Sequence, residues 1–256
     1  MKFRSPVLII ILLLFSFADS FSQIISIEKV NCRVSEGDLE TIKKIAKFEK
    51  DLYNNLFNTH DNDSLLINVS ILSTSDYKNM ASKSRGLHKT WGFYSPSEDH
   101  SYVWKQPQYL GTVIHEMSHC LLRHNLNNPP RWLNEGIAEF CGSMVIDGDK
   151  VSYMPDAQSI RTVRNMVLEK PIDLNNFIEL EQSNWSDREI RSNLYSISYA
   201  IVYFLIKKNP SLLKRTLLLM KDGNSATDAI DHSYGGFNKF ENDFNAFYRS
   251  TLIKPI

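Results

Sequence analysis

The chain has 256 residues, of which 43% are hydrophobic, and its 29 basic side chains balance its 29 acidic ones. This length and apolar content predict one sizeable hydrophobic core, which can be built as two lobes. The zero formal net charge and the lack of a Lys/Arg block argue against proteins that bind nucleic acid or anionic membrane surfaces. We therefore expect neither as a partner.

The N-terminus has the pattern of a secretory signal peptide. A basic start precedes a short apolar run at residues 7–17, and Ala18 and Ser20 suit the minus-three and minus-one positions of a signal peptidase site. The run is shorter than the about 20 apolar residues that a membrane-spanning helix needs. We expect a signal peptide at residues 1–20, with cleavage after residue 22 as the alternative. The chain would then be exported (secreted, periplasmic or extracellular), with no stable membrane span after cleavage; an uncleaved N-terminal anchor is the competing interpretation.

The segment after the signal predicts a strand, a helix and a second strand. Residues 24–34 have the alternating, β-branched character of a strand, and capping residues that begin with Ser35 introduce an amphipathic helix through about residue 57. Residues 65–72 form an apolar run typical of a buried strand, and a short helix begins near Ser75. Together these elements predict an N-terminal α/β lobe.

Two aromatic segments, residues 91–94 and 101–104, flank a turn-forming stretch and predict a β-hairpin. The hairpin comes shortly before the motif described next. Its edge is therefore a candidate site for an extended peptide, because a free edge offers main-chain donors and acceptors to any sequence. An ordinary sheet edge without a ligand is the alternative.

The pentapeptide His-Glu-Met-Ser-His at residues 115–119 is the strongest chemical signal in the chain. On a helix, His115 and His119 lie one turn apart on one face, so both imidazoles can reach one zinc ion, with Glu116 beside them. A pair of surface histidines is the alternative. The flanking apolar residues would bury this helix, however, and a buried cluster of this kind without a partner is costly.

A second stretch can complete the metal site. An Asn-Asn-Pro-Pro sequence at residues 127–130 lets the chain reverse, and Glu135 and Glu139 then follow one helical turn apart. These carboxylates offer the missing third ligand. Another large zincin branch takes its third ligand from a histidine six residues after the second, and this chain has Asn at that position.

Four further side chains have less specific interpretations. His124 is one position away from that third-ligand position and would face away from the motif histidines, so we interpret it as a surface residue. Three cysteines are an odd number for an exported protein. Cys120 and Cys141 could face each other and form a disulfide, or stay free as small buried side chains, which is the expected state of Cys32.

The C-terminal half is predicted to be almost wholly helical. A short turn segment at residues 145–151 precedes the helices, which are separated by Pro171, Pro210 and the glycine pair at 235–236. The predicted helices lie near residues 157–169, 187–208, 210–221 and 236–252.

The two stretches around the motif together resemble the gluzincin metallopeptidases. Trp-Leu-Asn-Glu-Gly at residues 132–136 is similar to an element of aminopeptidase N-like enzymes, and residues 130–140 as a whole more closely resemble the compact peptidase MA-like exported proteins. The resemblance implies Glu135 as the third zinc ligand. It also implies that Glu139, at the position of an acid in the thermolysin pattern, hydrogen-bonds a zinc-bound histidine and fixes its orientation.

The resemblance extends to a tyrosine and to the order of the elements. Tyr195 begins a segment similar to the helix of aminopeptidase N-like enzymes whose leading tyrosine donates to the oxyanion, with Tyr199 and His232 as alternative donors. The implied fold is α+β and zincin-like (thermolysin-like). An N-terminal mixed α/β lobe, residues 24–126 with the metal-binding helix, and a mainly helical C-terminal lobe, residues 127–256, would form one catalytic domain with the cleft between them.

We therefore expect a secreted zinc metallopeptidase of the gluzincin type that acts on a peptide or protein substrate. One zinc ion would activate water and Glu116 would serve as the general base. The chain lacks the Gly-X-Met-Glu-Asn segment that binds a free α-amine in the aminopeptidases, so exopeptidase activity is unsupported. Two alternatives stay open: a zinc-containing protein that binds or matures peptide or glycan with little or no turnover, and a pair of structural helices that binds no metal.

Overall fold

The computed structural model describes residues 24–83, 90–147, 150–181 and 183–250. The fold mixes α and β structure and is mostly helical with small sheets, which confirms the predicted class at this level. The predicted signal peptide at residues 1–20 lies outside the described residues. Within the described ranges, no helix is both long enough and apolar enough to cross a membrane.

The N-terminal half contains a sheet of four strands, β1 (Ile25–Val30), β2 (Ile67–Leu72), β3 (Gly92–Ser95) and β4 (His100–Trp104). Their order is β1-β2-β4-β3. β1, β2 and β4 run parallel, whereas β3 pairs antiparallel with β4. The predicted hairpin is therefore confirmed, and β3 is an edge strand of the sheet.

Three α-helices and a 3₁₀ helix accompany this sheet: α1 (Glu36–Phe57), η1 (Asp61–Ser64), α2 (Thr74–Ser82) and α3 (Tyr109–Asn125). α3 packs against β2, β3 and β4, and α1 packs beside α3. Alternate residues of β4 point to opposite faces of the sheet. Val103 belongs to the main core, whereas Trp104 stacks on Tyr77 of α2 in a small cluster on the other face.

Local conformations set the ends of the first two elements. β1 ends at Val30 because Asn31 adopts a left-handed conformation with φ 51°, so the strand is shorter than the sequence indicated. Ser35 caps α1 by accepting a hydrogen bond from the main-chain N–H of Asp38 at 3.0 Å. Asn58, also left-handed, ends the helix after Phe57, the residue at which the sequence predicted its end.

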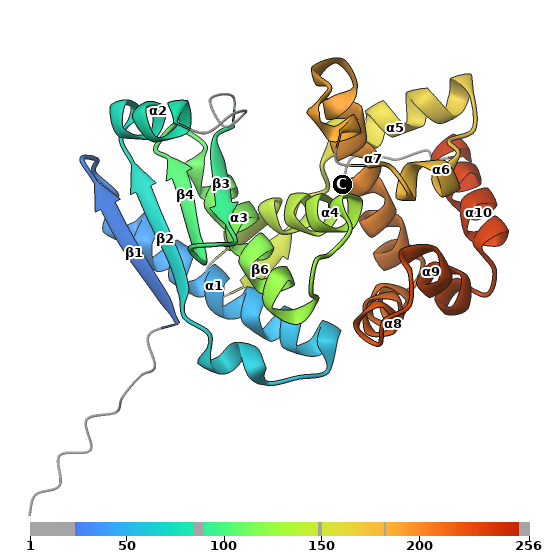
Figure 1. The fold of residues 1–256 in the computed structure, drawn as a ribbon, viewed down its shortest axis with the longest axis horizontal. Helices are drawn as coiled ribbons and strands as arrows, with labels where there is room; N and C mark the ends of the chain where they lie inside the picture. Colours follow the sequence, from blue (N-terminus) through green and yellow to red (C-terminus); the bar gives the residue numbers. More distant parts are fainter. Residues whose placement is uncertain (1–23, 84–89, 148–149, 182, 251–256) are drawn as a thin grey trace, which may run out of the picture.

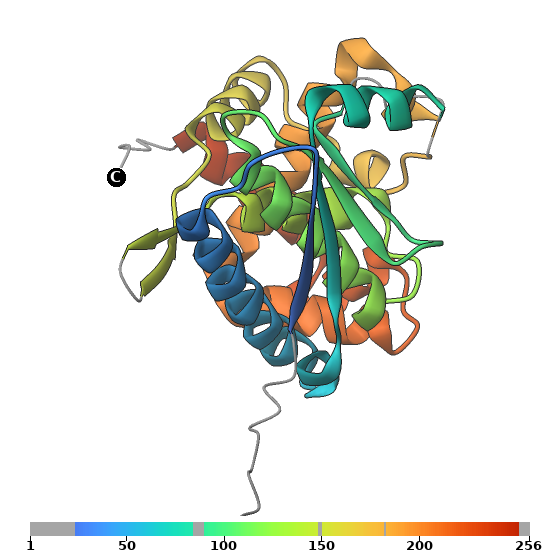
Figure 2. The ribbon, with the colours of Figure 1, turned by 90° about the vertical axis from the view of Figure 1, so that its left-hand side faces the viewer.

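The C-terminal half is helical with one hairpin. The turn segment predicted at residues 145–151 lies in a hairpin whose strands were not predicted: β5 (Met144–Asp147) and β6 (Lys150–Tyr153) pair antiparallel and project from the body (Figure 2). Strands of four residues are too short to show a clear alternation. The helices of this half are α4 (Arg131–Gly142), α5 (Ala157–Glu169), α6 (Leu174–Ile178), the 3₁₀ helix η3 (Asn184–Ser186), α7 (Arg188–Lys208), α8 (Pro210–Lys221), α9 (Ala226–Tyr234) and α10 (Phe237–Ser250).

The four longer predicted helices of this half, α5, α7, α8 and α10, are confirmed within two residues at each end, and α6 and α9 were not predicted. α6 has only five residues, too few for a helical period. α9 carries a signal that sequence reading could have used, since Ser225 caps its start and Gly235 ends it in a left-handed conformation.

One hydrophobic core extends through both halves, from Ile25 of β1 to Tyr248 of α10. α3 and α4 lie between the sheet and the C-terminal helices (Figure 1). α4 approaches α7 closely at Gly136, where a Cβ would lie 2.5 Å from the main-chain oxygen of Ser198. Because α4 also packs on α3, this contact fixes the position of Glu135 relative to the motif helix.

Candidate metal centre

α3 presents both motif histidines from one face. Its buried side is apolar, with Val113, Met117 and Leu121 fully buried in the core, and this burial keeps the helix in place over the sheet. His115 and His119 lie one turn apart, and their Nε2 atoms are 3.0 Å from each other. The predicted convergence of the two imidazoles is therefore present.

Glu135 reaches the same point from α4. Its Oε2 lies 3.5 Å from Nε2 of His115 and 3.7 Å from Nε2 of His119. The three side chains form one of two groups in the described part of the chain whose ligand atoms could hold a metal ion. The structure thus brings together the three residues expected as metal ligands.

The remaining polar atoms of these ligands have other partners. Nδ1 of His119 lies 3.0 Å from Oδ1 of Asn134, and Nδ1 of His115 lies 3.7 Å from Oε1 of Glu139. The contact with the Asn134 oxygen favours a proton on Nδ1 of His119, which leaves the Nε2 lone pair of that ring for a metal. Glu139 therefore lies next to a motif histidine at ion-pair distance, and the hydrogen bond that the resemblance implied stays a prediction.

The two carboxylate oxygens of Glu135 also have different partners. Oε1 pairs with Nε of Arg131 at 2.8 Å, one helical turn away on α4. Oε2 is buried and has no hydrogen-bond partner among the described residues. A buried carboxylate oxygen without such a partner is costly, so its position between two imidazole nitrogens indicates a site for a cation.

The distances fit a small tetrahedral ion. Bonds of about 2.0–2.1 Å to nitrogen and oxygen place the ligand atoms of a tetrahedral zinc site about 3.3 Å apart. The three observed separations, 3.0, 3.5 and 3.7 Å, bracket this value. Two imidazoles and one carboxylate are also the ligand set of catalytic zinc sites that keep a fourth position open. The residues present therefore fit zinc.

The charges around the site favour a cation. Burial alone would lower the pKa of His115, but the carboxylates around it, Glu135 and Glu139 foremost, raise it to about 10. Burial lowers the pKa of His119 to about 4, and Glu135 opposes this only in part. For Glu135 itself, burial raises the pKa but the neighbouring cationic groups lower it to about 2. The cluster is thus stabilised by positive charge, which a divalent ion supplies.

Glu116 lies beside the cluster in a large cavity. Its Oε2 is 3.9 Å from Nε2 of His119. The cavity has a volume of about 1290 Å³ and is lined by His115, Glu116, Glu139 and Tyr195, among others. Burial raises the pKa of Glu116 to about 7, although His115 opposes the shift. A carboxyl group with this pKa can accept and return a proton near neutral pH.

The edge strand β3 lies directly against Glu116. A Cβ at Gly92 would lie 2.7 Å from Cγ2 of Thr112 and 3.1 Å from Cγ of Glu116, so glycine permits the close approach of the strand. Trp91, which is 57% exposed, lines the same cavity. The expected peptide-binding edge therefore borders the cavity, and peptide binding there stays a prediction.

Tyr195 reaches the cavity from α7. Nη2 of Arg131 donates to its hydroxyl oxygen at 3.4 Å, so the hydroxyl proton is available to another acceptor. Burial and the charge of Glu135 raise the pKa of Tyr195, which keeps the hydroxyl protonated at neutral pH. Tyr195 thus has the position and the protonation state of a hydrogen-bond donor.

The two alternative donors lie elsewhere. The hydroxyl of Tyr199 accepts a hydrogen bond from the main-chain N–H of Asp156 at 2.9 Å and so helps to hold the start of α5. His232 is exposed on α9. Neither is among the described residues that line the cavity.

Two residues of the site were not singled out from the sequence. Asn134 orients His119, and Arg131 contacts both Glu135 and Tyr195. A signal for Arg131 existed, because an Arg and a Glu four residues apart on a helix commonly pair. For Asn134 the sequence held no such signal, since its role depends on how α4 packs on α3.

The structure shows the state of the three cysteines and the surroundings of His124. Cys32, Cys120 and Cys141 are all free, so the disulfide considered between the last two is not formed and the alternative of free thiols is confirmed. His124 is exposed and lies outside the cluster of His115, as predicted. It does have a partner, however, because its Nε2 lies 3.0 Å from Oδ2 of Asp99.

Comparison with known protein families finds one match. Residues 109–220 match a family described as a protein of unknown function (DUF1570). The matched span begins at the first residue of α3 and ends within α8, so it includes every residue of the candidate metal centre. No curated protein matches the chain.

Proposed function

We propose that the chain is an exported, zinc-dependent peptidase of the gluzincin type with a zincin-like (thermolysin-like) arrangement of two lobes around a cleft. The observation that carries the proposal is the convergence of His115 Nε2, His119 Nε2 and Glu135 Oε2. They meet next to an acid, Glu116, that lines a cavity large enough for a peptide segment. Export rests on the N-terminal sequence pattern alone.

The roles of the residues follow from their positions. His115, His119 and Glu135 would hold the ion, and a bound zinc supplies a Lewis acid that activates water and polarises a carbonyl group. Glu116, which lies beside the ligands in the cavity, would take the proton of the attacking water and deliver it to the leaving amine. The Tyr195 hydroxyl would donate to the negative charge that develops on the substrate oxygen, a contribution of about 3 kcal/mol.

Three further side chains would position these groups. Asn134 and Glu139 contact the Nδ1 atoms of the two histidines and so hold each ring with Nε2 toward the ion. Arg131 contacts both the outer oxygen of Glu135 and the hydroxyl of Tyr195. A single guanidinium therefore links the third ligand to the oxyanion donor.

The test is the substitution Glu116→Gln, followed by profiling of cleavage sites in a proteome-derived peptide library. The variant should retain its zinc, because Glu116 is not a ligand, and lose about 100-fold to 10,000-fold in cleavage rate. Glu169→Gln, an exposed acid on α5, is the matched control and should cleave like the wild type. Unchanged cleavage by Glu116→Gln would contradict the assignment.

Metal analysis separates the alternatives. A wild-type chain that retains zinc through His115 yet cleaves nothing across diverse peptides would favour the protein that binds or matures peptide or glycan without turnover. A chain whose zinc content is unchanged by His115→Ala, or that takes up no zinc, would favour structural helices that bind no metal at this position.

A further inference from the structure

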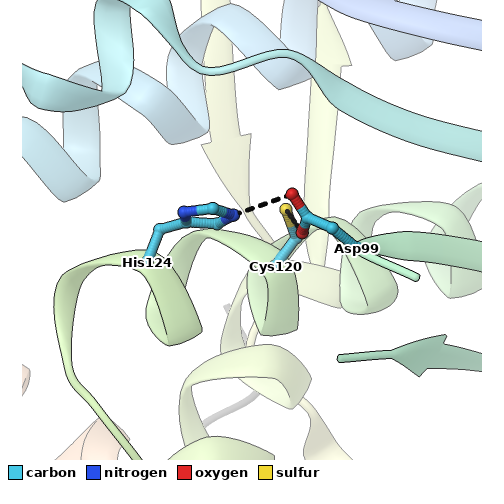
Figure 3. A group of neighbouring side chains, drawn as sticks. All are labelled: Asp99, Cys120 and His124. Atoms are coloured by element: carbon cyan, nitrogen blue, oxygen red, sulfur yellow. Dashed lines mark hydrogen bonds and ion pairs between the residues drawn. The ribbon is translucent and has the colours of Figure 1, made fainter. Parts of the chain in front are cut away.

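A second group of metal-ligating side chains lies outside the candidate metal centre. It consists of Asp99, Cys120 and His124, whose ligand atoms all lie within 4.8 Å of one another (Figure 3). The peptidase proposal uses none of the three. Below we call them the Asp-Cys-His cluster.

Two elements build this cluster. Cys120 and His124 are one turn apart on α3, so both side chains project from one face, as Figure 3 shows. Cys120 follows His119 by one residue, which rotates it by about 100° to another face of the helix. Asp99 comes from the turn between β3 and β4, where it adopts a left-handed conformation with φ 47°.

Asp99 contacts the other two residues through different oxygens. Nε2 of His124 lies 3.0 Å from Oδ2 of Asp99, and Sγ of Cys120 lies 3.5 Å from Oδ1. One ligand atom from each residue lies within 4.8 Å of the others, so small side-chain shifts would bring them to the separation of about 3.3 Å that nitrogen and oxygen ligands have around a tetrahedral zinc ion. The carboxylate is also held from outside, because the Tyr94 hydroxyl donates to its Oδ1 at 2.6 Å. A contact of that kind orients a ligand.

The surroundings leave one side open. Cys120 is buried, 1% exposed, whereas the side chains of Asp99 and His124 are each 39% exposed. An ion placed between the three would have the sulfur beneath it and solvent on the carboxylate and imidazole side. Water could therefore enter as a fourth ligand, as in many three-ligand sites.

We propose that Asp99, Cys120 and His124 form a second metal site for Zn²⁺ or a similar thiophilic divalent ion. One sulfur, one nitrogen and one oxygen donor suit zinc and cobalt, whereas magnesium and calcium require oxygen donors. The ion would join the β3–β4 turn to α3. Because β3 also carries Gly92 against Glu116, this second ion would hold the edge strand in its position beside the first site.

The test is a Co²⁺ titration of the metal-free full-length protein, followed by near-ultraviolet absorption. Cobalt bound to a thiolate gives a sulfur-to-cobalt charge-transfer band, and the His115, His119 and Glu135 site contains no sulfur. The band therefore reports the second site alone. We expect two equivalents of cobalt to bind, only one of them with the band, and excess Zn²⁺ to abolish it.

Matched variants assign the band. Cys120→Ser should lose it, while Cys141→Ser, a buried cysteine on α4, should keep it. His124→Ala changes an exposed residue, so it should fold normally and weaken cobalt binding by at least about tenfold. His115→Ala should lose the other equivalent and retain the band, so a failure of the peptidase proposal would leave this test intact.

Three results would overturn the proposal: no charge-transfer band at saturating cobalt, a band that persists in Cys120→Ser, or an unchanged cobalt affinity in His124→Ala. Any of them would mean that the Asp-Cys-His cluster is a hydrogen-bonded contact between the turn and the helix that holds no ion.

Discussion

α3 carries two clusters of metal-ligating side chains that are built alike but differ in the contacts of their ligands. Each combines two side chains one helical turn apart with a carboxylate from another element. At His115 and His119 the ligand atoms converge while the other ring nitrogens contact Asn134 and Glu139. In the Asp-Cys-His cluster the imidazole lies 3.0 Å from a carboxylate oxygen, whereas in the first cluster the imidazoles lie 3.5 and 3.7 Å from Oε2 of Glu135. Oε2 of Glu135 has no hydrogen-bond partner among the described residues, whereas both oxygens of Asp99 have partners.

The surroundings of the two clusters differ more than their spacing. Both place two side chains one turn apart on α3, so spacing alone does not distinguish them. The first cluster has partners on both histidines, a large cavity beside it and an acid, Glu116, next to its ligands, whereas in the second cluster the outside partner is the Tyr94 hydroxyl at Asp99. We expect the first cluster to bind zinc more tightly and the second to be more open to exchange.

The largest expected effect comes from Glu135→Gln. An amide in place of the carboxylate removes the anionic ligand and leaves a poor metal donor, so the first equivalent of zinc and all cleavage activity should be lost. The cobalt charge-transfer band of the Asp-Cys-His cluster should remain. Zinc analysis and the peptide assay measure both effects. Retained zinc together with activity above a tenth of the wild-type rate would exclude Glu135 as a ligand.

A smaller effect is expected from Asn134→Ala, which removes the partner of Nδ1 of His119. The loss of an orienting contact of this kind commonly costs 10-fold to 100-fold in metal affinity, roughly, and we expect that range here. Competition with a chromophoric chelator measures it. Asn127→Ala, an exposed asparagine in the loop before α4, is the control and should bind zinc like the wild type. Equal affinities in the two variants would show that Asn134 does not orient the ring.

Helix packing under the first cluster gives the third prediction. At Gly136 a Cβ would approach the main-chain oxygen of Ser198 to 2.5 Å, and neither main chain can move without displacing a helix. Gly136→Ala should therefore destabilise the fold by about 1–3 kcal/mol and weaken zinc binding at the first cluster only. Urea unfolding measures the first effect. In Gly37→Ala the new Cβ would have Ser35 Oγ as its nearest neighbour at 3.9 Å, so its stability should be unchanged or slightly higher.

The sequence was sufficient to predict features that depend on residues near one another in the chain. Helical spacing is visible in the pair His115 and His119 and in the pair Glu135 and Glu139. Ser35 is a recognisable capping residue at the start of α1. The positions of these elements in space depend on packing that spacing does not encode. This is why Asp99 was not recognised as a neighbour of Cys120, which lies 21 residues later, and why His124 was interpreted only as a surface residue.

Glu49 is a further residue whose state only the tertiary structure reveals. In the sequence it is one of several acids along an amphipathic helix. In the structure it is fully buried, and neither carboxyl oxygen has a hydrogen-bond partner among the described residues. Burial raises its pKa well above the usual value, so the folded state favours the neutral acid. Asp51, two residues later on the same helix, is exposed.

This contrast gives the last prediction, on pH dependence. Because the folded-state pKa of Glu49 lies above the unfolded-state value, the folded protein binds more protons, and stability is lost as pH rises above about 4.5 toward the folded-state pKa. The loss is at most about 1.4 kcal/mol per pH unit. Glu49→Gln stays neutral and should escape it. The variant should therefore match the wild type near pH 4 and become progressively more stable from pH 5 to 8.

Urea unfolding of both proteins across this range, at one fixed zinc concentration, measures the difference. Taking the difference cancels the titration of groups that do not interact with Glu49; His115, whose charge lowers the pKa of Glu49, is not one of them. Asp51→Asn, at an exposed position on the same helix, is the control. Parallel stability curves for Glu49→Gln and the wild type would mean that Glu49 is ionised in the fold. The charge of His115, which favours the ionised form of Glu49, would then outweigh the effect of burial.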